Sequence, residues 1–105
     1  MIGALKTVSV YVEDQQRAME FYVGKLGFVI RRSLRMGSAP GNWIEVSPPG
    51  GGTCLVLHPK SMMPDWAERK PSMVFYCPDV ERTCAELARR GVSIGSRGTP
   101  RVRQR

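Results

Sequence analysis

The chain is organised around the segment Val8-Ser9-Val10-Tyr11-Val12-Glu13-Asp14, which continues to Phe21-Tyr22 and Leu26-Gly27-Phe28. Its first part alternates valine with polar or aromatic residues, at the period of two that a half-buried β-strand requires. Asp14 follows the alternation and can accept hydrogen bonds from the free N–H groups of a helix start. The segment therefore predicts a strand that leads directly into a helix.

The apolar residues after Asp14 recur at steps of three and four, as they do along one face of a helix. They are Ala18, Phe21, Tyr22 and Leu26. This stripe can lie on the valine face of the strand. Gly27 is expected to end the helix, because glycine takes the left-handed C′ conformation without steric cost.

Length and composition indicate one small soluble domain. The chain has 105 residues, of which 42% are hydrophobic and 24% charged, and no apolar run approaches the roughly 20 residues that a membrane helix needs. The N-terminal residues lack the basic and apolar regions of a secretory signal. We therefore expect a cytoplasmic protein without a membrane partner.

The positive charge is concentrated at the C-terminal end. The net charge is +7, but four of the sixteen Lys and Arg residues stand in the last nine positions, and without them it falls to +3. A nucleic-acid partner is therefore not expected. The basic tail 96–105 is interpreted as a solvated or disordered end, with a contact to an anionic partner as the alternative.

The remaining residues up to 71 predict three strands and a linker. The strands are expected at 28–34, 42–46 and 53–58, with the last two forming a hairpin across the turn Pro48-Pro49-Gly50-Gly51-Gly52. The linker 59–71 contains three prolines and is expected to hold a short helical turn around Asp65-Trp66-Ala67. The cysteines Cys54, Cys77 and Cys84 lack zinc-type or redox spacing and are interpreted as buried reduced thiols.

From residue 72 the organisation repeats. The alternation in 72–77 predicts a strand, Asp79 a helix start, Gly91 a helix end and 92–94 another strand. The expected apolar stripe of this second helix is Val80, Cys84, Leu87 and Ala88. A repeated strand, cap, helix and stop indicates a pseudo-symmetric architecture.

On these residues the chain resembles the vicinal oxygen chelate superfamily, which includes glyoxalases, bleomycin-resistance proteins and extradiol dioxygenases. The resemblance continues through Trp43-Ile44-Glu45-Val46, the Pro-Pro-Gly-Gly-Gly turn and the second unit at 72–94. It implies an α+β fold with a curved mixed sheet whose concave face holds a metal or a small ligand. The expected single domain, 1–105, then consists of a βαβββ module at 5–58, the linker 59–71, an incomplete second module at 72–95 and the tail 96–105.

The chain departs from this family at the metal positions. The resemblance implies ligands at Thr7, Val56 and Ser72, and none of these residue types is a good metal donor. The strands that would carry a fourth ligand do not follow Ile94. We therefore expect no metal and no cofactor, and we interpret His58, the single histidine, as a structural or solvated residue more readily than as a ligand.

A small-molecule site is expected on the sheet face opposite the first helix. If the valines of the first strand face the helix, alternating residues of the strands and of the repeat face away from it. The expected ligand-binding residues are Thr7, Ser9, Tyr11, Trp43, Glu45, Val56, His58, Ser72 and Tyr76. A mixed aromatic and polar lining suits a small organic ligand. Alternatively, the aromatic members of this set pack a dimer interface.

Three functions remain open. They are a metal-free protein that binds a small organic molecule, a metal-dependent lyase, isomerase or dioxygenase, and an assembly module without a ligand. The metal positions favour the first over the second. Catalytic residues stay unidentified, because the sequence lacks a recognisable nucleophile–base arrangement or paired-carboxylate motif. A homodimer is expected, because an unfinished sheet leaves an edge that tends to find a partner strand.

Overall fold

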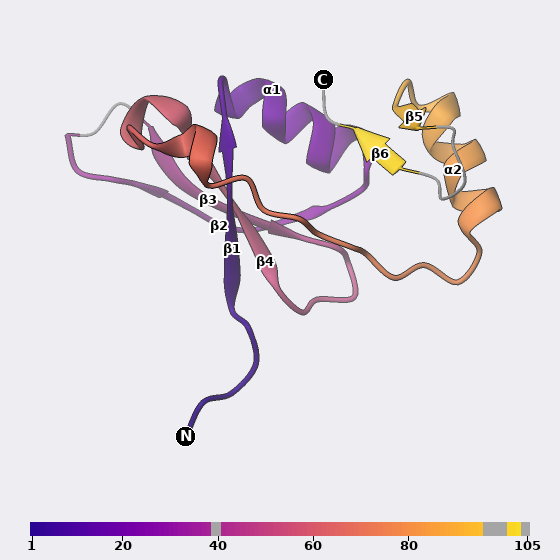
Figure 1. Cartoon of the computed structure of the whole chain (residues 1–105), viewed down its shortest axis with the longest axis horizontal. Helices are drawn as coiled ribbons and strands as arrows, with labels where there is room; N and C mark the ends of the chain where they lie inside the picture. The colour runs from indigo at the N-terminus through magenta and orange to yellow at the C-terminus, as the bar shows by residue number, and fades with distance from the viewer. Residues whose placement is uncertain (39–40, 96–100, 104–105) are drawn as a thin grey trace. The chain divides into compact units, whose positions relative to one another are not determined.

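The computed structural model in Figure 1 describes residues 1–38, 41–95 and 101–103. The chain divides into two compact units, Met1–Ser72 and Met73–Arg105. The first unit consists, in chain order, of β1 (Thr7–Val12), α1 (Gln15–Met19), the π-helical turn η1 (Glu20–Lys25), β2 (Val29–Arg35), β3 (Asn42–Ser47), β4 (Cys54–Pro59) and two 3₁₀ turns, η2 (Lys60–Met62) and η3 (Trp66–Glu68). The expected βαβββ module is confirmed.

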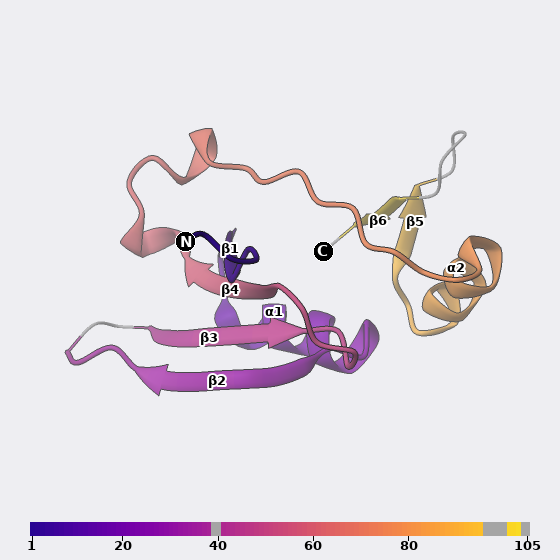
Figure 2. The same cartoon turned by 90° about the horizontal axis from the view of Figure 1, so that it is seen from below.

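The four strands of the first unit form one mixed sheet in the order β1-β4-β3-β2. β1 is parallel to β4, and the β4–β3 and β3–β2 pairs are antiparallel. Figure 2 views this sheet with β2, β3 and β4 in front of α1, so the helix covers the face that is turned away from the reader. The sheet therefore has a helix face and a second face on the other side.

The helix begins and ends where the sequence predicts. The Asp14 carboxylate accepts hydrogen bonds from the backbone N–H groups of Gln16 at 2.8 Å and Arg17 at 3.3 Å, and Gly27 has a φ of 78°. The second half is a π-helix instead of the expected α-helix, since the Leu26 N–H donates to the Phe21 carbonyl five residues earlier. The wider turn ends the helix without breaking its apolar stripe.

The core lies between this helix and the sheet. Ala18, Phe21 and Tyr22 are buried on the helix side. The rings of Phe21 and Tyr22 meet edge to face at 5.2 Å. The buried sheet residues Leu55 and Leu57 are at most 2% exposed. Burial also raises the pKa of Tyr22 above its ordinary value, because the phenolate is poorly solvated there.

Gln15 joins the start of the helix to two strands. Its amide nitrogen donates to the carbonyls of Asn42 and Leu57, both at 2.7 Å, and its amide oxygen accepts from the Asn42 N–H at 3.1 Å. One side chain thereby fixes α1 against the ends of β3 and β4.

The linker is more ordered than its composition suggests. The expected helical turn is present as η3, and η2 forms a second turn directly after β4. The Lys60 ammonium lies 3.0 Å from the Glu13 carboxylate and 4.0 Å from the centre of the Trp66 ring. These contacts bind the linker to the end of β1.

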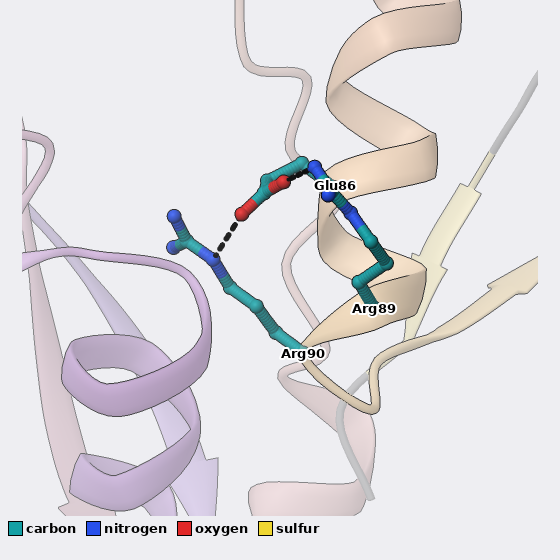
Figure 3. A network of polar contacts seen from close by, with 3 residues as sticks. All are labelled: Glu86, Arg89 and Arg90. Carbon is teal, nitrogen blue, oxygen red and sulfur yellow. Dashed lines mark hydrogen bonds and ion pairs between the residues drawn. The ribbon is translucent and has the colours of Figure 1, made fainter.

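The second unit contains α2 (Val80–Arg89), β5 (Ser93–Gly95) and β6 (Arg101–Arg103). The helix starts as expected, because the Asp79 carboxylate accepts from the Arg82 N–H at 3.0 Å, and it ends before Gly91, whose φ is 85°. Figure 3 shows three charged side chains on this helix, in which Glu86 pairs with both Arg89 and Arg90.

Three expectations for the second unit are wrong. The segment 72–77 forms no strand, and Val74 and Tyr76 are 96% and 93% exposed. A strand needs a neighbouring strand to hydrogen-bond with, and no strand among the described residues pairs with this segment. Within the expected stripe of α2, Leu87 is buried but Val80 is 45% exposed. Finally, residues 101–103 of the expected solvated tail pair with β5 in an antiparallel ladder; the rest of the tail lies outside the described residues.

The cysteines and the membrane prediction have different outcomes. The three cysteines are free thiols, as expected, but each is partly exposed instead of buried. Cys54 lies at the start of β4, opposite Thr7 of the edge strand β1. In the parts of the chain that the structure describes, no helix is long and apolar enough to cross a membrane.

Candidate ligand-binding face

The register of β1 and β4 places the expected site residues of these strands on one face. Thr7, Ser9 and Tyr11 lie opposite Cys54, Val56 and His58 respectively. Paired residues of neighbouring strands point to the same side of a sheet. The rings of Tyr11 and His58 confirm this arrangement, since their centroids are 5.2 Å apart with an angle of 62° between the ring planes.

β3 adds two residues to the same face. Glu45 lies opposite Val56 in the antiparallel register of β3 and β4, and Trp43, two residues earlier on β3, shares its side of the strand. The Trp43 indole N–H donates a hydrogen bond of 2.6 Å to Oε2 of Glu45. These contacts define what we call the far face, the side of the sheet opposite α1: Thr7, Ser9, Tyr11, Trp43, Glu45, Val56 and His58.

The centre of the far face is buried and its surroundings are partly exposed. Val56 is 1% exposed and Glu45 is 8% exposed. Tyr11, Trp43 and His58 are half-buried. The face therefore has an apolar floor at Val56, one carboxylate beside it and three aromatic rings that solvent or a ligand can reach.

Ser72 and Tyr76 do not join this face through strand register. Ser72 is exposed at the end of the first unit, and Tyr76 belongs to the second unit. Their assignment depended on a strand at 72–77, which is not formed. A role for these two residues in ligand binding therefore stays a prediction.

Sequence reasoning missed the charged and aromatic contacts of the linker. Lys60 and Trp66 have no periodic pattern around them, and the only available signal was an aromatic residue among prolines. A second pair follows in the same segment, where the Arg69 guanidinium lies 2.9 Å from the Asp65 carboxylate. This hydrogen bond lowers the pKa of Asp65 and raises that of Arg69. Both side chains are exposed, so the pair orders the linker with little gain in stability.

The residues at the implied metal positions do not fit a metal. Val56 has no donor atom, and Thr7 and Ser72 offer neutral hydroxyl groups, which are weak ligands for transition metals. Within the described residues, no group of three or more His, Cys, Asp or Glu side chains is arranged to hold a metal ion. We therefore derive no chemistry through a metal, and its absence from the protein stays a prediction.

Comparison with known proteins agrees with this geometry. Residues 4–104 match the sequence profile of the Glyoxalase/Bleomycin resistance protein/Dioxygenase superfamily. The chain belongs to this superfamily. Among the relatives of this glyoxalase-superfamily protein, the uncharacterised protein YetH of Bacillus subtilis (strain 168) is 44% identical over 94 residues, which cover 90% of this chain and 78% of YetH. YurT of the same organism is 30% identical over 100 residues, covering 87% of this chain and 77% of YurT.

Solved structures share the fold. A superfamily member from Sphaerobacter thermophilus DSM 20745 has a TM-score of 0.78 at 27% identity, covering 90% of this chain and 77% of that one. TnmS3, an antibiotic binding protein from Streptomyces sp. CB03234, has a TM-score of 0.72 at 31% identity, covering 93% of this chain and 78% of TnmS3. The expected curved mixed sheet of this superfamily is thereby confirmed.

Proposed function

We propose that this glyoxalase-superfamily protein binds a small organic molecule on the far face without a metal. The observation that carries the proposal is the pairing of Tyr11 with His58 at 5.2 Å on the same face as the hydrogen-bonded Trp43 and Glu45. Aromatic surfaces with a few placed polar groups are typical of sites for small organic ligands. The likeness to the antibiotic-binding protein TnmS3 supports the same class of ligand.

Binding is favoured over metal-dependent catalysis by the residue types at the implied metal positions. A lyase, isomerase or dioxygenase of this superfamily would need several well-placed donors with an open position for substrate, and Thr7, Val56 and Ser72 do not provide them. Binding that survives prolonged treatment with EDTA is the expected result. Loss of binding after EDTA, restored by one added divalent metal, would favour the enzyme instead.

The two tryptophans allow a direct test of where the ligand lies. Trp43 is on the far face and Trp66 is in η3 of the linker. Trp66→Phe leaves Trp43 as the single fluorophore, and Trp43→Phe leaves Trp66. We expect acridone, a neutral three-ring aromatic compound, to quench the fluorescence of the Trp66→Phe variant more strongly and at lower concentration than that of the Trp43→Phe variant.

The Trp66→Phe variant also serves as the matched control, because phenylalanine keeps an aromatic ring beneath Lys60. Equal quenching of both variants would place the ligand away from the far face. A saturable signal confined to Trp66 would contradict the proposal, and so would the absence of any saturable signal in a wider screen of aromatic compounds.

We also propose that the protein forms a homodimer. β1 is an edge of the sheet and carries no charge, proline or glycine between Thr7 and Val12. The other edge strand, β2, carries Arg31, Arg32 and Arg35 and a register irregularity, features that discourage strand pairing. The segment 72–77 has the alternation of a strand but forms none, and Val74, Phe75 and Tyr76 are exposed. A second copy related by a two-fold axis can give this segment a partner strand.

A further inference from the structure

Glu45 is an unusual residue for the centre of a sheet. It is 8% exposed, and its neighbour across the β3–β4 pair is the buried Val56. A carboxylate in such a place loses most of its hydration and needs hydrogen bonds or a positive charge to compensate. The Trp43 indole N–H supplies one hydrogen bond, to Oε2.

The other oxygen of Glu45, Oε1, has no partner among the described residues and is not fully buried. Within the described chain, Oε1 takes part in no further hydrogen bond or ion pair. Among the described residues, every fully buried side-chain oxygen or nitrogen has a hydrogen-bond partner. Because Oε1 has none, it cannot be fully buried and keeps some contact with solvent. Arg32 is the nearest cation by register, opposite Glu45 in β2, but its side chain is exposed and makes no ion pair with Glu45 in the described structure.

His58 offers a second acceptor on the same face. Its Nδ1 lies 3.0 Å from the Pro59 carbonyl oxygen. A carbonyl cannot donate, so a hydrogen bond there requires the proton on Nδ1 and, in the neutral ring, leaves Nε2 with a lone pair. With a neutral His58 ring, the far face therefore presents two acceptors, Nε2 of His58 and the carboxylate of Glu45.

We propose that the ligand of the far face is an aromatic cation whose protonated nitrogen, in the ring or in an attached amine, donates to the Glu45 carboxylate. This inference rests on the proposed binding function and names the class of its ligand. Residues on adjacent strands that are two positions out of register lie about 7–8 Å apart, which is the relation between His58 and Glu45. A molecule of two or three fused rings spans that distance, with its rings beside Tyr11 and His58 and its cation at Glu45.

The test compares three probes of similar size in isothermal titration calorimetry: 9-aminoacridine, a cation; acridone, a neutral molecule; and anthracene-9-carboxylate, an anion. The cation should bind tightest and the anion weakest. Glu45→Gln should weaken 9-aminoacridine about ten-fold or more, as expected for loss of a charge-assisted hydrogen bond, and leave acridone unchanged. Acridone binding and an unchanged thermal melt show that this variant is folded.

Two further variants sharpen the result. Arg32→Gln removes a competing cation opposite Glu45 and should strengthen 9-aminoacridine binding. Glu20→Gln removes an exposed carboxylate from η1 on the helix face and should leave it unchanged. Equal affinities for cation and neutral probe, or an unaffected Glu45→Gln variant, would overturn the inference while the proposed function stands. If none of the three probes binds, the inference fails; the proposed function fails with it only if the wider screen of aromatic compounds also gives no saturable signal.

Discussion

Replacing Gln15 with alanine should destabilise the first unit more than any other single change at the helix start. The substitution removes three hydrogen bonds that join α1 to the backbone of Asn42 and Leu57. Asn42 is exposed, so water can replace the bonds at that residue at a net cost of roughly 0.5 kcal/mol each. Leu57 is 0% exposed, and its carbonyl is left with an unsatisfied lone pair, which costs about 1–3 kcal/mol.

The expected loss for Gln15→Ala is therefore about 2–4 kcal/mol in the free energy of unfolding, a large part of the roughly 5–15 kcal/mol typical of a domain. Urea unfolding followed by tryptophan fluorescence measures it. Gln16→Ala is the matched control, because Gln16 is exposed and its backbone keeps the bond to Asp14; it should change stability by less than about 0.5 kcal/mol.

A third variant separates the donors of Gln15 from its acceptor. Gln15→Glu keeps an oxygen that can accept from the Asn42 N–H, but it cannot donate to the carbonyls of Asn42 and Leu57. It should be at least as destabilising as Gln15→Ala. A Gln15→Ala loss within about 0.5 kcal/mol of the Gln16→Ala control would refute the reasoning.

Two further predictions concern pH and assembly. Burial raises the pKa of Tyr22 above its ordinary value of 10.0, so the unfolded chain loses this proton at a lower pH than the folded chain, and stability should fall as pH rises past about 10. Between pH 8 and 11, the urea midpoint of Tyr22→Phe should fall less than that of the parent protein. An equal fall of the urea midpoint in both proteins would contradict this prediction. Val74→Lys, at a 96% exposed position of the segment 72–77, should convert the proposed dimer to a monomer in light scattering. Val29→Lys is the control and should not, because it lies on β2, the edge strand whose arginines discourage strand pairing. A monomeric parent protein would contradict the dimer proposal.

The elements that the sequence predicted correctly are those that depend on nearby residues. Asp14 and Asp79 each accept a hydrogen bond from a backbone N–H at most three residues further on, and Gly27 and Gly91 each adopt a positive φ. Such features need no distant partner, so a local pattern is enough to identify them. The same holds for the alternation of β1, which placed Tyr11 on the face where its ring meets His58.

The expectations that failed depend on residues far along the chain. The segment 72–77 has the composition of a strand, but strand propensity reflects packing on a sheet and gives no partner by itself. Residues 101–103 form a strand despite their charge, because β5 provides a ladder for them. The contacts of Lys60 with Glu13 and Trp66 join the linker to the end of β1. A contact between residues far apart in the sequence leaves no periodic pattern by which it could be predicted.

The two faces of the sheet differ in the residues that occupy buried positions and in how their polar groups are hydrogen-bonded. This difference supports a function for the far face. On the helix face, buried positions are apolar, as at Leu55 and Leu57, and both the nitrogen and the oxygen of the Gln15 amide are hydrogen-bonded. On the far face, a nearly buried position carries Glu45 with one of its oxygens unused by the described protein. A well-packed apolar residue would serve stability better at that position. Departures from the rules of packing are expected at functional sites, so Glu45 is the residue of this sheet whose chemistry is best explained by a ligand.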